Sequence, residues 1–286
     1  MKLPVVGYQQ AESVEDAVRL LVESEGDGKI LAGGQSLIPM MAYRLLTPSI
    51  LIDIGRIGEL KSIEVSSSEL KIGALVRWCD ILESHDVAST HPLLREAISY
   101  VAHYQIRNRG TIGGSLAHCD PAAECPATVL ALDGVIDIAG PDGQRSMPAH
   151  GFFQGLLSTD LGADEIITGV RLPLWTSSRR WAFKEFSRRQ GDFALAGVCL
   201  HFEIDDGKFS SSRVVGFGVG DSAMTLPQTE AALNGLRIDD DLGSVLALAA
   251  EEIDPPHDPH APPEYRRAVF STLLGRAIKQ TLSRAE

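Results

Sequence analysis

The chain contains two short glycine pairs, each following an apolar residue and preceding polar side chains. The first lies in Ala32-Gly33-Gly34-Gln35-Ser36 and the second in Thr111-Ile112-Gly113-Gly114-Ser115. A glycine pair after a strand lets backbone N–H groups approach an anion closely, because no side chain intervenes, and a following helix start adds partial positive charge. One such loop suits one phosphate group. Two loops that face each other suit a pyrophosphate, so the pattern favours a fold that brings two such turns together around a dinucleotide.

The first glycine pair lies inside a compact strand–loop–helix–strand pattern. Ser13 is predicted to be the N-cap of a helix that begins at Val14, where apolar residues recur with helical spacing. Residues 29–32 are expected to form a short strand, residues 37–46 a helix and residues 50–54 a second buried strand. Short buried strands joined by helices are typical of a parallel sheet, so we expect a small α/β lobe at the N-terminus.

The second glycine pair belongs to a longer stretch of mixed elements. Apolar residues alternate at 70–76, which predicts a strand, and a helix is expected to start at His91-Pro92. Asp120-Pro121 predicts another helix start, with Asp120 as the N-cap, and this helix is expected to reach Leu132. Further strands are expected at 135–139 and 165–172. These elements predict a larger α+β lobe.

The pattern changes after a linker at 175–178. Antiparallel strands are expected at 180–186, 194–203 and 214–219, followed by helices at 242–252 and 265–282. We therefore predict two domains, residues 1–174 with lobes of about 1–56 and 57–174, and residues 179–286.

Composition excludes several classes of function. The chain has 286 residues and a formal net charge of −12, which argues against nucleic acid or an anionic membrane as the main partner. No signal peptide and no apolar run of about 20 residues is visible, so we expect no membrane span and a cytoplasmic location. The four cysteines form no C-x-x-C pair, which argues against a metal centre. Neither glycine loop is a G-x-G-x-x-G fingerprint or a Walker loop, so the pattern does not favour a standard NAD site.

Three stretches together resemble one known family. Residues 32–39, 105–115 and 184–194 are similar in sequence and order to the FAD-binding medium subunit of molybdenum hydroxylases. That family includes the medium subunit of carbon monoxide dehydrogenase and the FAD domain of xanthine dehydrogenase. The resemblance covers nearly the whole chain. It implies an α+β fold, with a two-lobed FAD-binding domain followed by a C-terminal α+β domain that contains an antiparallel sheet.

The resemblance also implies a function. Members of the family take electrons from two [2Fe–2S] clusters in an iron–sulfur small subunit and pass them to an external acceptor. The substrate is oxidised in a molybdopterin-containing large subunit, and the assembly is expected to be a dimer of heterotrimers. On this interpretation the chain holds FAD and no metal, and no residue of its own acts as a catalytic acid or base. The substrate and the acceptor stay open, because no motif in the chain identifies either.

The family's cofactor contacts can be transferred position by position. The pyrophosphate and ribityl contacts fall on the two loops, at Leu31, Ala32, Gly33, Gly34, Gln35, Ser36, Thr111, Ile112, Gly113, Gly114 and Ser115. Several relatives have Asn where this chain has Ser115. The remaining contacts fall on Asp120 and Glu124 at the adenosine half, Lys184 at the flavin, Ile167 near the flavin or adenine, and Phe193 beside the isoalloxazine, where some relatives have Tyr.

Two other interpretations remain open at this point. The chain could be a self-contained FAD oxidoreductase of the same fold, or a binding or assembly module whose glycine loops are only turns. Whether five further residues near the motifs have any role also stays open. They are His103, His118, Cys119, Arg188 and Arg189.

Overall fold

The N-terminal lobe is a small α/β unit built on a three-stranded parallel sheet. The structure is a computed structural model that describes residues 2–283. Its first elements are β1 (Gly7–Gln10), α1 (Val14–Glu23), β2 (Gly28–Leu31), α2 (Leu37–Ala42) and β3 (Ile50–Asp53). The strand order is β1-β3-β2, with both pairs parallel, which confirms the predicted sheet. The Ser13 side chain accepts a hydrogen bond from the Asp16 N–H, so the predicted N-cap of α1 is also confirmed.

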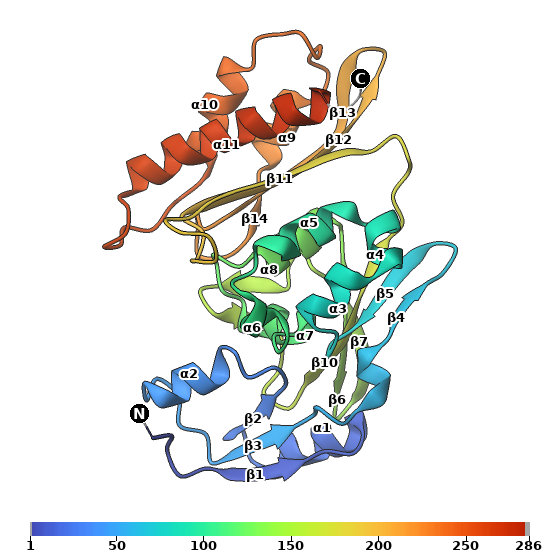
Figure 1. Cartoon of the computed structure of the whole chain (residues 1–286), viewed down its shortest axis with the longest axis vertical. Coiled ribbons are helices and arrows are strands. Elements are labelled where there is room, and N and C mark those ends of the chain that lie inside the picture. The colour runs from blue at the N-terminus through green and yellow to red at the C-terminus, as the bar shows by residue number, and fades with distance from the viewer. Residues whose placement is uncertain (1, 284–286) are drawn as a thin grey trace.

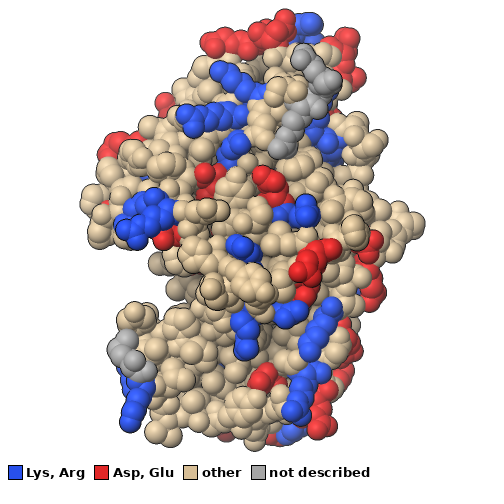
Figure 2. All heavy atoms as spheres, viewed as in Figure 1, with Lys and Arg blue, Asp and Glu red and all other residues tan. Residues whose placement is uncertain are grey.

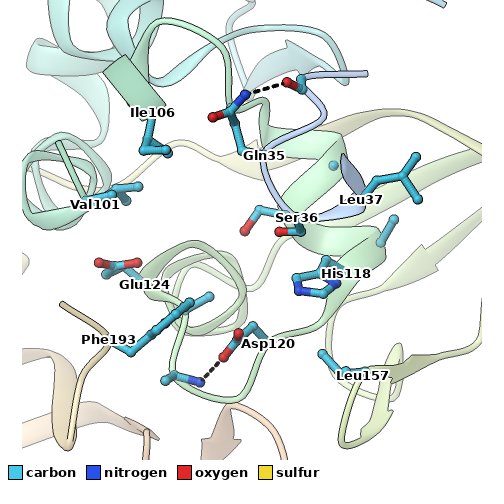
Figure 3. Close-up of a pocket in the computed structure, with 18 of the residues that line it drawn as sticks. Gln35, Ser36, Leu37, Val101, Ile106, His118, Asp120, Glu124, Leu157 and Phe193 are labelled. Atoms are coloured by element: carbon cyan, nitrogen blue, oxygen red, sulfur yellow. Dashed lines mark hydrogen bonds between the residues drawn. The ribbon is translucent and has the colours of Figure 1, made fainter. Parts of the chain in front are cut away.

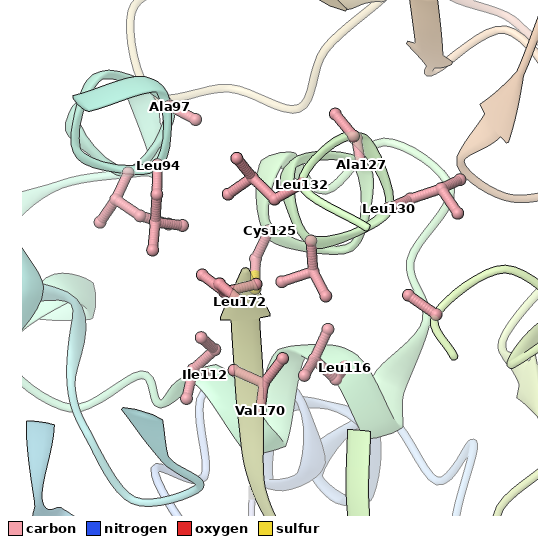
Figure 4. Close-up of a cluster of buried hydrophobic side chains, with 14 of the residues drawn as sticks. Leu94, Ala97, Ile112, Leu116, Cys125, Ala127, Leu130, Leu132, Val170 and Leu172 are labelled. Atoms are coloured by element: carbon pink, nitrogen blue, oxygen red, sulfur yellow. The ribbon is translucent and has the colours of Figure 1, made fainter. Parts of the chain in front are cut away.

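The second lobe packs helices against a five-stranded antiparallel sheet (Figure 1). The sheet has the order β4-β5-β10-β6-β7, and the elements are η1 (Gly58–Lys61), β4 (Ile63–Val65), β5 (Glu69–Gly73), α3 (Trp78–Glu83), α4 (His85–Thr90), α5 (Pro92–Tyr100), α6 (Tyr104–Arg107), α7 (Ile112–His118), α8 (Glu124–Ala131), β6 (Val135–Gly140), β7 (Gly143–Pro148), β8 (Phe153–Gly155), β9 (Ser158–Thr159) and β10 (Ile166–Pro173). Its core lies between α5, α7, α8 and β10, where Leu94, Leu116, Leu132 and Leu172 are buried (Figure 4).

The helix expected to start at Pro121 begins three residues later, at Glu124. Asp120 is therefore not its N-cap. The Asp120 carboxylate instead accepts a hydrogen bond from the Ala122 N–H at 2.9 Å, which forms a local turn. The Pro121 carbonyl accepts from the Gly218 N–H at 2.7 Å, so this turn is held from the C-terminal part of the chain. That long-range contact is invisible in the local sequence.

The C-terminal part is a four-stranded antiparallel sheet with helices on one face. Its elements are β11 (Arg180–Phe186), β12 (Ala196–Asp205), β13 (Lys208–Phe217), β14 (Met224–Thr225), α9 (Pro227–Leu233), α10 (Gly243–Glu252) and α11 (Pro263–Ser283). One face of the sheet packs against α9 and α11, with α10 packed on these two helices, and the other face packs against α5 and α8 of the second lobe (Figure 1). The predicted fold class, two lobes followed by an α+β domain with an antiparallel sheet, is confirmed. None of the helices in the described part of the chain is long and apolar enough to span a membrane.

A buried histidine joins the C-terminal sheet to the second lobe. The His201 Nε2 lies 3.0 Å from the Ala131 carbonyl and must carry the proton to donate to it. His201 Nδ1 is buried without a partner. Burial, followed by the nearby Arg179 charge, lowers the pKa of His201 to about 3. The folded chain therefore holds this ring neutral at every pH above that value.

This histidine predicts a specific loss of stability in acid. The unfolded chain binds a proton at His201 below a pKa of 6.5, and the folded chain does not do so until about 3, so the free energy of unfolding should fall as the pH falls between them. The contribution is roughly 5 kcal/mol across that window. Urea unfolding at several pH values should show a shallower acid slope for His201→Gln. A parallel slope in both chains would contradict the assignment.

Candidate cofactor site

A cavity of about 920 Å³ lies where the two lobes and the C-terminal part meet. Its walls come from segments 29–37, 101–124, 157–167, 188–195 and 256–266. The space-filling view shows a notch between the N-terminal lobe and the rest of the molecule, and positive and negative side chains are interspersed on the same face (Figure 2). Cofactor sites commonly have this size and lie between domains.

The first glycine loop forms a set of free donors in the cavity wall. In the described part of the chain, the backbone N–H groups of Gly33, Gly34, Gln35 and Ser36 have no hydrogen-bond partner. Gly34 has φ +71°, and the Gln35 side chain donates to the Gly33 carbonyl at 2.9 Å, which stabilises the turn (Figure 3). Successive free N–H groups in such a turn bind an anion. The donor set therefore fits a diphosphate group.

The second glycine loop has a different part in the site. The Gly113 N–H donates to the Ala74 carbonyl at 2.9 Å, and the Gly114 N–H donates to the Thr111 hydroxyl at 3.2 Å. The Ser115 N–H is bonded to the Thr111 carbonyl. Because these donors are already used, the second loop is not a free anion nest of the kind the first loop forms. Its glycines permit close packing, since a Cβ on Gly113 would lie 2.6 Å from the Ala74 Cβ.

The two loops lie against each other, as the repeated pattern indicates. A Cβ on Gly33 would lie 2.2 Å from the Arg109 carbonyl oxygen, so only glycine allows the first loop to approach the segment that leads into the second. The Ser36 side chain makes no capping bond to α2 and lies in the cavity wall between the other labelled residues (Figure 3).

Most of the residues assigned by family resemblance line the cavity. They are Ala32, Gly33, Gly34, Gln35, Ser36, Thr111, Gly113, Gly114, Ser115, Asp120, Glu124, Ile167 and Phe193. Leu31, Ile112 and Lys184 are not in the wall. Leu31 ends β2 and Ile112 is fully buried in the second lobe's core. Lys184 alternates along β11 with Phe183, which packs toward the second lobe, so Lys184 lies on the strand face turned toward α11.

Glu124 and Phe193 lie on the same side of the cavity (Figure 3). The family resemblance assigns Glu124 to the adenosine half of the cofactor and Phe193 to the isoalloxazine. The two side chains share one end of the cavity, so a single half of the cofactor would meet both. Phe193 is 72% exposed, which leaves this end open to the surface. Burial, followed by the Asp120 charge, raises the pKa of Glu124 to about 7.

Sequence reasoning missed the contribution of the Pro-rich segment and α11. Pro256, Asp258 and His260 line the cavity, together with Arg266, whose side chain is only 4% exposed. Arg266 donates to the carbonyls of Leu195 and Gly218 and to the Asp258 carboxylate. No local signal marks this arginine, because an arginine on a terminal helix is normally solvated.

The five residues whose role was open divide into two groups. His103, His118 and Arg188 line the cavity, whereas Cys119 and Arg189 do not. Cys119 ends α7 in the left-handed conformation at φ +51°, and its thiol lies 3.5 Å from the Gly155 carbonyl. Its position is therefore explained by packing and helix termination.

These features define a class of protein, because a loop of free N–H donors, a cavity of about 920 Å³ and an exposed aromatic ring at one end fit a dinucleotide with a planar ring. Among the described residues no group of three or more potential metal ligands occurs. The chain belongs to the family of FAD-binding domains in molybdopterin dehydrogenases, whose sequence model matches residues 4–175. The C-terminal domain of the carbon monoxide dehydrogenase flavoprotein matches residues 181–281.

Individual relatives agree with this family. The chain is 38% identical to the 6-hydroxypseudooxynicotine dehydrogenase complex subunit alpha of Paenarthrobacter nicotinovorans, over 100% of this chain and 97% of the relative. It is equally similar to the nicotine 6-hydroxylase medium subunit of the same organism, over 99% and 100%. The solved carbon monoxide dehydrogenase from Hydrogenophaga pseudoflava superposes with a TM-score of 0.97 at 35% identity, covering 99% of both chains.

The cofactor of this chain is therefore FAD, and the chain is the FAD-binding medium subunit of a molybdenum hydroxylase, a component of an oxidoreductase. The free donors of the first loop would hold the pyrophosphate. When bound, FAD supplies reversible two-electron chemistry.

Proposed function

We propose that the chain transfers electrons from [2Fe–2S] clusters of a small subunit through its FAD to an external acceptor. The small subunit would be joined by a molybdopterin-containing large subunit, and the complex would be a cytoplasmic dimer of heterotrimers. The names of the relatives support this, because they describe subunits of larger dehydrogenases and hydroxylases. The open cavity end at Phe193 supports it further, since electrons must enter and leave at an accessible edge of the cofactor.

The proposed contacts of FAD follow from the geometry of the cavity. The first-loop N–H groups at residues 33–36 would bind the pyrophosphate. The second loop would place helix α7 and the Ser115 side chain along the middle of the cofactor. Phe193 would border the isoalloxazine ring. Because Glu124 lies on the same side of the cavity, we place it at that ring too, in place of the adenosine half to which the family resemblance assigns it.

Purification of the tagged chain from its native host tests the proposal. We expect FAD, iron and molybdenum in fixed proportion, and two further subunits, one of which carries a C-x₄-C-x₂-C cluster motif. In rapid mixing, the chemically reduced small subunit should reduce the bound flavin. A chain that carries FAD, lacks both partners and oxidises a small molecule alone would instead be a self-contained oxidoreductase.

A further inference from the structure

Strand β11 places one carboxylate on the face that packs against the FAD-binding lobes. The Phe183 ring packs at a tilt against Tyr100 of α5, with ring centroids 4.9 Å apart, whereas Phe186 contacts Tyr265 of α11 on the opposite face. Because side chains alternate along a strand, Glu185 shares the face of Phe183. Glu185 therefore points from the C-terminal sheet toward α5 and α8.

The surroundings of Glu185 are apolar. Its register partner on β12 is Gly197, and the Phe217 ring covers that glycine so closely that a Cβ there would lie 2.0 Å from the ring. The Glu185 Oε2 atom is buried without a hydrogen-bond partner. No lysine or arginine in the described part of the chain forms an ion pair with it. A carboxyl group with one oxygen buried away from any donor or cation favours its neutral, protonated form.

Helix α8 packs against β12 and carries a second carboxyl, that of Glu124, which lines the cavity. The Thr128 hydroxyl donates to the Glu124 carbonyl at 2.7 Å and lies 3.7 Å from the Cys199 thiol, and Cys199 is the register partner of Phe183. The face of α8 that carries Glu124 and Thr128 therefore packs against β12, the strand that pairs with β11. Burial, followed by the Glu124 charge, raises the pKa of Glu185 to about 8.

The groups around the two carboxyls can be ordered from the cavity to the surface of the protein. Glu124 lines the cavity, and Asp120 acts on it from the preceding turn. The pKa of the Cys199 thiol on β12 is raised by burial, and the charges of both glutamates add to this effect. On the outer side stands Tyr100, which is 37% exposed and whose pKa is raised by burial and then by the Glu96 and Glu185 charges.

We propose that Glu124 and Glu185 are a proton-transfer pair that connects the cofactor cavity with the surface beside Tyr100. The inference rests on the proposed function, because iron–sulfur clusters deliver electrons without protons. Full reduction of FAD to FADH₂ takes up two electrons and two protons, and reoxidation releases the same two electrons and two protons. Glu124 donates a proton into the cavity and accepts another from Glu185. Glu185 then takes up a proton from solvent on the side of Tyr100. During reoxidation the protons pass in the reverse order.

Infrared spectroscopy on the full chain tests the pair without any partner subunit. At pH 6 the wild-type chain should show a protonated carboxyl band that disappears as the pH passes through 7 to 8. Glu185→Gln should remove part of this band, whereas Glu96→Gln, which removes a nearby carboxylate outside the pair, should leave it intact. A wild-type spectrum with every glutamate and aspartate ionised at pH 7 would refute the proposal even if no variant folds.

Rapid reduction of the FAD-loaded chain by dithionite gives the kinetic readout. Above pH 8 we expect Glu185→Gln to slow proton uptake, followed with a pH-indicator dye, by about tenfold or more. FAD retention should be unchanged, because Glu185 is outside the cavity wall. Equal rates in Glu185→Gln and Glu96→Gln at every pH would overturn the pair. This reductant bypasses the iron–sulfur subunit, so failure of the proposed electron route would show only in the mixing experiment with that subunit.

Discussion

The substitution Ser36→Asp should yield a folded chain that purifies without FAD. Ser36 lies in the cavity wall beside the free N–H groups of the first glycine loop, and its hydroxyl does not cap α2. A carboxylate at this position would stand next to the pyrophosphate charge. At about 4 Å and an effective dielectric constant of about 20, one such charge pair costs roughly 4 kcal/mol, or about a thousandfold in affinity.

The matched control for this prediction is Ser36→Asn, which has the same shape as the aspartate variant and no charge. Both variants should give the same circular dichroism spectrum, and only Ser36→Asn should retain the flavin absorbance after gel filtration. If Ser36→Asp holds FAD as tightly as Ser36→Asn, the first loop does not bind the pyrophosphate.

The glycines themselves give a less selective test of the same contact. A side chain on Gly33 would collide with the Arg109 carbonyl, and one on Gly113 would collide with Ala74. Overpacking of this kind typically costs about 1–3 kcal/mol by itself. Substitutions at these two positions would therefore disturb the fold and the cofactor together, whereas Ser36 already carries a Cβ in a compatible conformation.

Local patterns predicted the elements whose causes are local. The Ser13 N-cap and the strand at 180–186 were correct, because capping and β-alternation act over a few neighbouring residues. The helix expected over 37–46 ends at Ala42, since the chain turns at Arg44 with φ +61°. The start of α8 was placed wrongly for a related reason, because a contact from Gly218 holds the preceding turn.

The candidate site shows the same division between local and distant causes. The glycine pattern located the anion-binding loop, because free N–H groups follow from the backbone of that loop alone. It did not reveal that the Ala74 carbonyl and the hydroxyl and carbonyl of Thr111 accept from the donors of the second loop, nor that Glu185 lies on the strand face turned toward the second lobe. Those facts depend on register and packing between segments far apart in the chain. Family resemblance likewise gave no sign that Lys184 faces away from the cavity, because that follows from how β11 is oriented between its two layers.

Arg266→Ala should cause the largest loss of stability of any single change considered. The guanidinium is buried, and it donates to the Leu195 carbonyl at 2.6 Å, the Gly218 carbonyl at 2.9 Å and the Asp258 carboxylate at 2.6 Å. Removing it leaves two buried carbonyls and a carboxylate without their donor. Loss of one partner of a buried ion pair costs about 3–5 kcal/mol, so the urea midpoint of the FAD-free chain should fall sharply at pH 7.

Asp258→Asn distinguishes the contribution of the ion pair with Arg266 from that of the hydrogen bonds that Arg266 donates to the two carbonyls. An asparagine keeps the oxygen that accepts from the His260 and Ala261 N–H groups, and it leaves the bonds from Arg266 to both carbonyls in place. Its carboxylate is also 31% exposed, so the loss should be about 1 kcal/mol. Equal losses for Asp258→Asn and Arg266→Ala would mean that the carbonyl bonds contribute little. A much larger loss of stability for Arg266→Ala would show that this side chain fixes the backbone at Gly218. The Gly218 N–H donates to the carbonyl of Pro121, a residue of the cavity wall.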